Sequence, residues 1–318
     1  MSSSYKPSDK SLWKGRVDGE TEEYLRWHQV IEAVDLDQMV DSLKSKAVFL
    51  GFCSDEGVRR NKGRVGAKEA PGKLREILSG LPYHSKGGIV DAGDVVCEGS
   101  DLEGAQEELG VRVAQILSDG GRPVVLGGGH EVTYGHYLGV RKAFPEKKIG
   151  IINLDAHLDI REPSNGKGNS GTGFFQIIEK EKNNKGAFHY LAVGIQPISN
   201  TKALYKYSKE NNVEIIEAEH VQSSEELKAI QETIQNFANK VDVIYLTIDM
   251  DVFAAPYAPG VSALNYNGLV PSGNFQKIYK QIIQLPNLMS IDVAELNPKF
   301  DIDNRTARLA ADLVFKLI

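Results

Sequence analysis

The sequence has little cysteine, no long apolar run and no excess of positive charge. Two cysteines among 318 residues, Cys53 and Cys97, are too few for a disulfide framework or a thiolate zinc site, and we expect both to be small buried residues. No apolar run approaches the roughly 18 residues that span a bilayer, and the polar start MSSSYKPSDK lacks the apolar segment of a signal peptide. The net charge of −6 argues against a nucleic-acid binder. We therefore expect a cytoplasmic protein with no nucleic-acid and no membrane partner.

The composition is that of a folded globular protein. Hydrophobic residues make up 41% of the chain and charged residues 25%, and a chain of this length buries a large core. No linker rich in Pro, Ser and Gly interrupts it. The sequence therefore predicts a single α/β domain over residues 1–318, with residues 1–45 as an amino-terminal extension packed on it.

Short apolar runs alternate with segments of helical composition. Segment 223–240 has the pattern of an amphipathic helix, and the Gly, Ser and Asn content of 162–173 is typical of a loop. Runs that are apolar along their whole length suit strands covered by helices on both faces, so we predict a three-layer α/β/α fold with a mainly parallel sheet. The predicted strands lie within 47–52, 87–93, 122–129, 148–156, 189–195, 213–218, 242–251 and 288–298.

Polar side chains follow four of the predicted strands. In open parallel sheets, ligands bind beyond the carboxyl ends of the strands, so these residues are candidates for a site. Because alternate residues of an extended segment point the same way, we expect neighbouring members of the set to converge. The candidates are His130, Asp155, His157, Asp159, Asp249, Asp251 and Glu295.

Four aspartates in one place require positive charge. Their burial without cations would be costly, whereas two divalent ions supply +4 against −4. Oxygen ligands with some imidazole and no thiolate favour manganese over structural zinc. Two such ions about 3.5 to 4 Å apart can activate a shared water, so the sequence predicts a hydrolase with two Mn2+ per subunit. The other histidines have no evident partner and are expected on the surface or in the core: His28, His84, His136, His189 and His220.

Four motifs carry a resemblance to a known family: GGGHE (127–131), NLDAHLD (153–159), TIDMD (247–251) and VAELNP (293–298). They resemble the ureohydrolases, the arginase and agmatinase group of binuclear manganese enzymes. The resemblance implies an arginase-like fold and a homo-oligomer. It also implies that Glu295 holds the cationic amidine of the substrate. For the metals, it implies one ion on His130 and Asp159, a second on His157 and Asp251, and Asp155 and Asp249 bridging the two.

Within this family the chain is most similar to the formimidoylglutamases, which cleave N-formimidoyl-L-glutamate to L-glutamate and formamide in histidine degradation. Ala254 and Ala255 stand where arginases carry a further Asp-Pro, and SGTGF (170–174) lacks the histidine that many relatives place there. The amino-terminal half and the loop VGIQPISNT (193–201) also resemble this subfamily. The likeness implies that Ser170 and Asn200, which lie in these two loops, contact the substrate.

Arg161 gives an independent argument for an acidic substrate. It lies two positions after Asp159, so its planar guanidinium could pair with a substrate carboxylate at the mouth of the site. N-formimidoyl-glutamate carries two carboxylates, arginine one and agmatine none, so an added cation favours the dianion. The basic run Arg59, Arg60, Lys62 and Arg64 is either a second anion contact or a solvated loop or subunit contact.

The expected reaction is attack by a metal-shared hydroxide on the formimidoyl carbon, with Asp159 moving the proton to the leaving nitrogen and Glu295 holding the amidinium. Two alternatives stay open at this point. One is hydrolysis of another guanidino or amidino compound, as in arginase or agmatinase. The other is a metal-binding scaffold that performs no hydrolysis.

Overall fold

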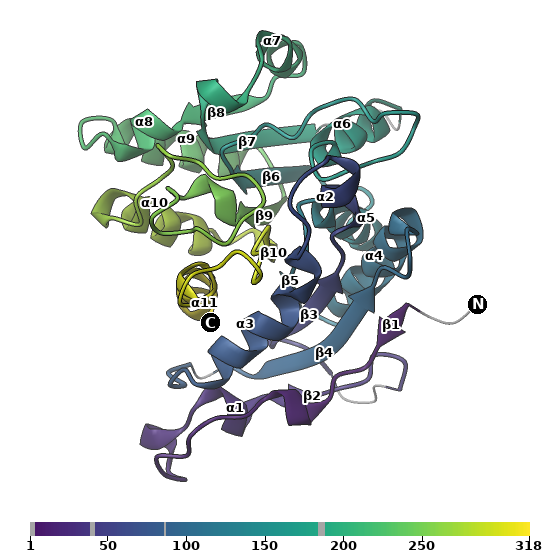
Figure 1. Cartoon of the computed structure of the whole chain (residues 1–318), viewed down its shortest axis with the longest axis vertical. Helices are drawn as coiled ribbons and strands as arrows, with labels where there is room; N and C mark the ends of the chain where they lie inside the picture. Colours follow the sequence, from purple (N-terminus) through teal and green to yellow (C-terminus); the bar gives the residue numbers. More distant parts are fainter. Residues whose placement is uncertain (1–3, 39–41, 86, 184–187) are drawn as a thin grey trace.

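The computed structural model describes residues 4–38, 42–85, 87–183 and 188–318. Within them, one sheet contains ten strands in the order β1-β4-β3-β5-β10-β9-β6-β7-β8, with β2 also paired to β4 (Figure 1). Every pair is parallel except β1 with β4. Each predicted apolar run forms a strand. The strands are β1 Tyr5–Lys6, β2 Glu32–Ala33, β3 Ala47–Cys53, β4 Ile89–Val96, β5 Arg122–Leu126, β6 Ile149–Leu154, β7 Phe188–Ile195, β8 Glu214–Glu217, β9 Val243–Asp249 and β10 Leu288–Ala294.

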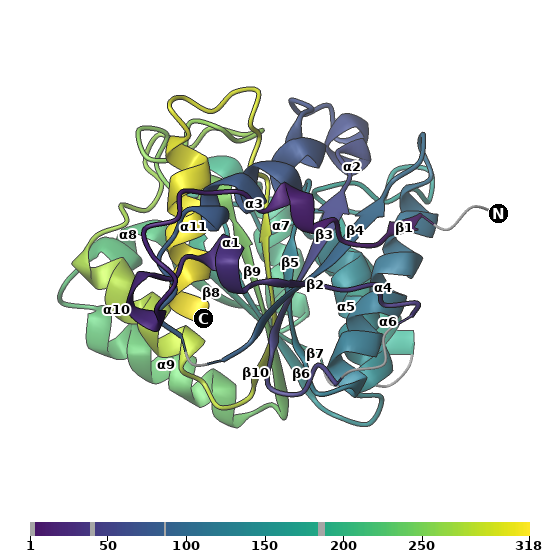
Figure 2. The same cartoon turned by 90° about the horizontal axis from the view of Figure 1, so that it is seen from below.

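Helices cover both faces of this sheet, which confirms the predicted three-layer α/β/α fold. Helices α4, α5 and α6 lie on one face, and α1, α3, α8, α9, α10 and α11 lie on the other (Figure 2). The predicted helix 223–240 corresponds to α9. The helices are α1 Trp27–Val30, α2 Glu56–Arg60, α3 Ala70–Ser79, α4 Leu102–Ser118, α5 Val132–Ala143, α6 Gly173–Asn183, α7 Lys202–Glu210, α8 Ala218–Gln222, α9 Leu227–Asn239, α10 Gly273–Ile283 and α11 Arg305–Leu317.

The sheet supplies side chains to two separate apolar cores, because successive residues of a strand point to opposite faces. Val48 and Leu50 of β3 pack in the core under α4, α5 and α6. Phe49, between them, packs in the core under α3, α9, α10 and α11. All three side chains are fully buried, so a strand that is apolar at every position satisfies both layers at once.

The segment before residue 45 packs against the edge of the sheet at β4. β1 pairs antiparallel and β2 pairs parallel with this strand. Trp13 is buried, and its Nε1 donates a hydrogen bond of 2.7 Å to Asp91 of β4. The guanidinium of Arg75, on α3, donates to both oxygens of the same buried carboxylate. This segment therefore covers an edge that would otherwise expose unpaired backbone groups.

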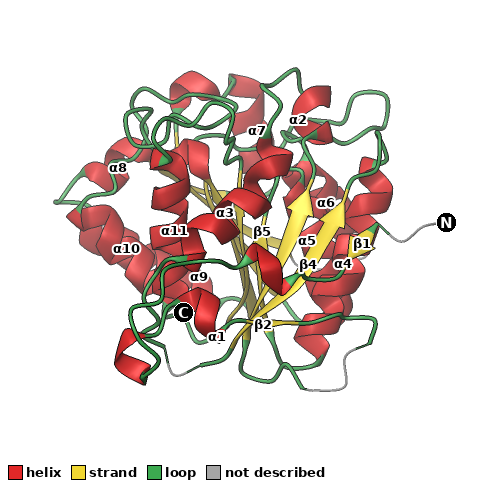
Figure 3. Cartoon of the chain, turned by 60° about the horizontal axis from the view of Figure 1, so that its bottom comes forward, coloured by secondary structure: helices red, strands yellow, loops and turns green. Residues whose placement is uncertain are grey.

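The strand order brings four segments that are distant in sequence side by side. β5, β10, β9 and β6 are consecutive neighbours in the centre of the sheet. Their ends are level, since Val293 pairs with Leu126, Ala294 with Asp249, and Leu154 with Ile248 of β9. The connections that follow the strands gather at this carboxyl edge (Figure 3). The edge is where an open parallel sheet holds its ligands.

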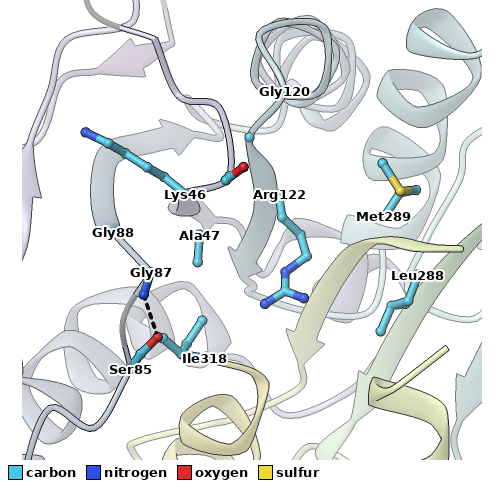
Figure 4. Close-up of a pocket in the computed structure, with 12 residues that line it drawn as sticks. Lys46, Ala47, Ser85, Gly87, Gly88, Gly120, Arg122, Leu288, Met289 and Ile318 are labelled. Atoms are coloured by element: carbon cyan, nitrogen blue, oxygen red, sulfur yellow. Dashed lines mark hydrogen bonds between the residues drawn. The ribbon is translucent and has the colours of Figure 1, made fainter. Parts of the chain in front are cut away.

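The opposite edge, at the starts of β3, β5 and β10, contains a cavity of about 330 Å³ (Figure 4). Arg122 lines it and donates a hydrogen bond of 2.5 Å to the carbonyl of Leu317, at the end of α11. This arginine therefore stabilises the carboxyl end of a helix. Among the described residues, no helix is long and apolar enough to cross a membrane.

Candidate metal centre and substrate pocket

The predicted site residues come together at the carboxyl ends of the four central strands. His130 lies four residues after β5, Asp155 directly follows β6, Asp249 ends β9, and Glu295 directly follows β10. All four side chains are buried. The strand order, which the sequence alone does not give, therefore converts four separate motifs into one site.

One group of donor atoms surrounds the imidazole of His130. Its Nδ1 lies 3.2 Å from Asp155 Oδ2, 3.0 Å from Asp159 Oδ2 and 3.1 Å from Asp249 Oδ2. The four donor atoms all lie within 4.8 Å of one another. One imidazole and three carboxylates thus face a common point.

A second group adjoins the first and shares Asp155 with it. His157 Nδ1 lies 3.0 Å from Asp251 Oδ2 and 3.4 Å from Asp155 Oδ1. Asp155 therefore turns one oxygen to each histidine, as a bridging carboxylate would. Asp249 belongs to the first group only, so its bridging role stays a prediction.

The convergence has a different local cause from the one that the sequence suggested. An extended strand was expected to aim alternate residues at one point, but β6 ends at Leu154, before Asp155. Instead, Asp155 Oδ1 accepts the backbone N–H of His157 at 2.7 Å, and Asp249 Oδ1 accepts that of Asp251 at 2.8 Å. Both are Asx turns, which fold the chain back within two residues. Two strands therefore end in the same turn, with a ligand-type side chain at each end of it.

The shifted pKa values in the cluster show that its carboxylates strongly favour a positive charge nearby. Burial, followed by repulsion from Asp251 and Asp155, raises the pKa of Asp249 well above 3.8. Burial also raises the pKa of Asp251 to about 6. Burial alone would lower the pKa of His157, but the carboxylates of Asp251 and Asp155 outweigh it and raise that pKa to about 12. The site thus binds a proton tightly, and a cation placed there would gain the same attraction.

The residues present fit a pair of manganese ions. Two imidazoles and four carboxylates, with no thiolate, are the donor types that such ions take. Asp251 Oδ1 is a buried oxygen with no hydrogen-bond partner among the described residues, as expected for an atom reserved for a ligand. The two donor groups share one carboxylate, so two neighbouring ions match the arrangement better than one.

Glu295 stands beside the cluster with one free oxygen. Its Oε1 accepts the backbone N–H of His130 at 2.9 Å, while its buried Oε2 has no partner among the described residues. Burial and the nearby Glu131 raise its pKa to about 8. The backbone of Glu295 is left-handed, with φ of 64°, and so is that of Asp159, with φ of 47°. Such conformations are unfavourable for these residues and concentrate at functional sites.

A cavity of about 100 Å³ opens onto the cluster. Arg161 and Ser170, both predicted to bind substrate, line it together with Asn61, which the sequence did not single out. Asn61 Nδ2 donates to Ser170 Oγ at 3.0 Å, and Arg161 Nη1 donates to Asn61 Oδ1 at 3.2 Å. The amide therefore connects the two predicted substrate contacts. The residues that line this pocket are Asn61, His130, His157, Asp159, Arg161, Ser170, Asp249, Asp251, Ser262, Ala263 and Glu295.

Asn200 was predicted to contact substrate, but it does not line this pocket. Its Oδ1 accepts the backbone N–H of Leu158 at 2.9 Å, and its Nδ2 donates to the carbonyls of Ala156 and Gln196. These bonds occupy the amide with the backbone of the loop that carries the metal-type ligands. Its placement supports a role in fixing that loop and does not support contact with substrate.

The basic run after β3 is used mainly within the protein. Arg59 and Arg60 both donate to Glu56, and Arg60 also donates to Glu103. Arg64 donates to the carbonyl of Ser262 at 3.1 Å. These arginines are absent from the pocket lining, so of the two interpretations of this run the second anion contact is not supported, whereas the intervening Asn61 is present. The sequence signal for Asn61 was hidden because it lies among more conspicuous charges.

The parallel sheet, with metal-type donors at the ends of its central strands, places the chain among α/β proteins with a candidate metal site at the carboxyl edge of the sheet. The family model described as the arginase family matches residues 45–318, and the chain belongs to that family. A formimidoylglutamase of Geobacillus thermodenitrificans is 44% identical over 311 residues, covering 96% of this chain and 94% of the relative. A formimidoylglutamase of Legionella pneumophila is 39% identical over 317 residues, covering 99% and 98%.

Solved structures give the same picture of the fold. The Trypanosoma cruzi formiminoglutamase with Mn2+2 has a TM-score of 0.76 and 27% identity, covering 89% of this chain and 95% of that one. The formimidoylglutamase of Bacillus subtilis has a TM-score of 0.78 at 24% identity, covering 95% and 94%. The second likeness concerns the fold alone.

Proposed function

We propose that the chain is a binuclear manganese hydrolase that cleaves N-formimidoyl-L-glutamate to L-glutamate and formamide. The observation that carries the proposal is the composition of one small pocket. Its lining combines residues of both donor groups with Glu295, which has an unpartnered oxygen, and with Arg161. A substrate with a cationic amidine at one end and carboxylates at the other matches this distribution of charge. Relatives that share 39–44% identity with this chain carry the same activity in their names.

The proposed metal ligands are the two donor groups. His130, Asp155, Asp159 and Asp249 would hold one Mn2+, and His157, Asp251 and the shared Asp155 the other. Bound manganese supplies Lewis acidity that makes water available as a nucleophile near neutral pH.

Glu295 orients the reacting group. Its Oε2 accepts an N–H of the amidinium, while Oε1 stays hydrogen-bonded to the backbone of His130. A cationic amidine bound beside this buried carboxyl group favours its ionised form, and the resulting ion pair keeps the amidine cationic and raises the electrophilicity of its carbon. The hydrogen bond to the backbone of His130 holds that carboxylate at a fixed position beside the donor groups.

Arg161, Ser170 and Asn61 form a hydrogen-bonded part of the pocket lining, where a substrate carboxylate binds. The guanidinium supplies the charge, and the amide of Asn61 holds it beside the hydroxyl of Ser170. Asp159 lines the same pocket and its side chain is more exposed than that of Asp155, so it can exchange a proton with the reacting groups. It takes the proton of the attacking water and delivers it to the leaving glutamate nitrogen.

A product assay on purified protein loaded with Mn2+ tests the proposal. We expect equimolar formamide and glutamate from N-formimidoyl-L-glutamate, and no urea from arginine or agmatine. Urea release would instead assign the pocket to a guanidino substrate. Stoichiometric Mn2+ binding without hydrolysis of any of the three compounds would identify a metal-binding scaffold.

We also propose a cytoplasmic homo-oligomer. Cys53 and Cys97 are both free thiols, as a reducing compartment favours. Ile198 and Tyr266 are 91% and 88% exposed, and both line one cavity of about 580 Å³, a surface suited to contact with a second copy. Light scattering on the purified chain tests the homo-oligomer, and cell fractionation tests the cytoplasmic location. A monomer at all concentrations would contradict the proposed oligomer.

A further inference from the structure

A chain of buried hydrogen bonds runs from His130 into the core behind the metal-type cluster. His130 Nε2 lies 3.0 Å from Thr247 Oγ1, on the side of the ring away from the carboxylates. Thr247 Oγ1 in turn donates to Asp292 Oδ1 at 2.6 Å. Both Thr247 and Asp292 are fully buried.

The strand register explains this chain of bonds. Thr247 on β9 pairs directly with Asp292 on β10, and Tyr245 pairs with Ser290. Residues two apart on a strand share a face, so Tyr245, Thr247 and Asp249 form one row that ends in the donor group. The polar row therefore leads along β9 directly to the cluster.

The far end of the chain anchors helix α5. Asp292 Oδ2 accepts the hydroxyl of Tyr245 and lies 2.7 Å from His136 Nδ1, while His136 Nε2 contacts Ser290 Oγ. His136 is the fifth residue of α5, which begins at Val132, two residues after His130. Asp292 thus links β9, β10 and α5 by hydrogen bonds behind the imidazole of His130. His136, which the sequence left without a partner and expected on the surface or in the core, is fully buried here.

We infer that Thr247 and Asp292 are positioning residues that fix His130 with its proton on Nε2 and its Nδ1 directed at a metal ion. The hydroxyl of Thr247 has one proton, and Asp292 receives it, so the oxygen can only accept from His130 Nε2–H. Nδ1 then remains as the ligand atom, facing three carboxylate oxygens at 3.0–3.2 Å. Partners of this kind orient metal-binding histidines and strengthen their binding.

Stability alone gives no reason for this network. Tyr245, Thr247, Ser290, Asp292 and His136 have no exposed surface and lie beside an apolar core. Replacing buried ionic groups with well-packed apolar ones is often neutral or stabilising, so such a network suits a task in which orientation matters. The inference rests on the proposed manganese site.

The test measures Mn2+ binding to protein freed of metal by chelation, with Thr247→Val, Thr247→Ser and Asp292→Asn compared with wild type. Val keeps the shape of Thr but removes the hydroxyl, and Ser restores it. We expect Thr247→Val to weaken Mn2+ binding about 10- to 100-fold. Thr247→Ser should stay within about threefold of wild type, and Asp292→Asn should weaken binding even if Thr247→Val does not fold.

Trp13→Phe is the matched control, because it removes one buried hydrogen bond to Asp91 in a separate network. It should lower the melting temperature without changing Mn2+ affinity. Wild-type affinity in both Thr247→Val and Asp292→Asn would overturn the inference, as would affinity losses that simply follow melting temperature across all variants, Trp13→Phe included. Failure of wild type itself to bind Mn2+ would instead refute the proposed function.

Discussion

Replacing Glu295 with Gln should abolish most turnover and leave manganese binding intact. The side chain is 4% exposed, and its Oε1 accepts the backbone N–H of His130. The amide oxygen of Gln preserves that bond. The amide nitrogen then occupies the position of Oε2 and presents a donor where the substrate amidinium also presents donors.

The size of the effect follows from the burial of the pair. Breaking a buried ion pair by removing one partner costs about 3–5 kcal/mol. At about 1.4 kcal/mol for each tenfold change in rate, kcat/KM should fall about 10²- to 10⁴-fold. Replacing a solvent-exposed carboxylate would lower kcat/KM far less, because water screens exposed ion pairs and their net contribution is about 0–1 kcal/mol.

Steady-state kinetics on N-formimidoyl-L-glutamate, with Mn2+ content measured on the same samples, test this reasoning. Glu181→Gln is a matched control, because Glu181 is buried and pairs with Arg141 on the α5 and α6 side of the protein. It should cost stability and leave kcat/KM within about threefold. The role given to Glu295 is refuted if Glu295→Gln keeps wild-type kcat/KM, or if it loses manganese together with activity.

Three further changes test other parts of the structure. Arg161→Ala should raise KM for the acidic substrate about 10-fold or more with little change in kcat; an unchanged KM would show that the carboxylate binds elsewhere. Gly128→Ala places a Cβ 1.8 Å from the carbonyl oxygen of Ser54 and should destabilise the protein by about 3 kcal/mol, whereas Gly72→Ala, which meets nothing within 4 Å, should not; equal melting temperatures would contradict this. Burial raises the pKa of Cys97 from 9.0 to about 11, so alkylation by iodoacetamide at pH 8 should be about 100-fold slower than for a free thiol and should rise up to about pH 11; rapid modification at pH 8 would contradict the assigned environment.

The strands were predictable because their signal is local. Runs such as 47–52 and 242–251 are apolar at nearly every position, which a two-sided parallel sheet requires. Their order in space is not local. β10 and β9 lie between β5 and β6, and this order depends on how the helices pack. It cannot be predicted from the residues of 122–129 or 148–156. The predicted convergence of the ligands therefore rests on their chemistry, and not on which strands are neighbours in the sheet.

The metal-type ligands were predictable for a similar reason, whereas the place of Asn61 in the pocket and of Asn200 outside it was not. Carboxylates and imidazoles that directly follow apolar strands are costly without a cation, so the types of residue carry the information. Asn61 and Asn200 are neutral amides that are common in any loop. Only their hydrogen bonds, to Arg161 and Ser170 in one case and to the backbone of the ligand loop in the other, separate the two roles.

The two faces of the central strands have different roles. One face packs in an apolar core, and the other carries polar residues that lead to the candidate site. On β9, Ile244, Leu246 and Ile248 pack in the core under α9, α10 and α11, while Tyr245, Thr247 and Asp249 alternate with them on the face under α5. β6 and β10 follow the same rule, with polar residues at Asn153 and Asp292 on the α5 face and aliphatic residues between them. One face can thus become polar toward the carboxyl ends of the strands because the other stays aliphatic throughout. The ligands sit where a polar interior meets the open edge of the sheet, and the apolar layer behind the other face holds the strands in register under them.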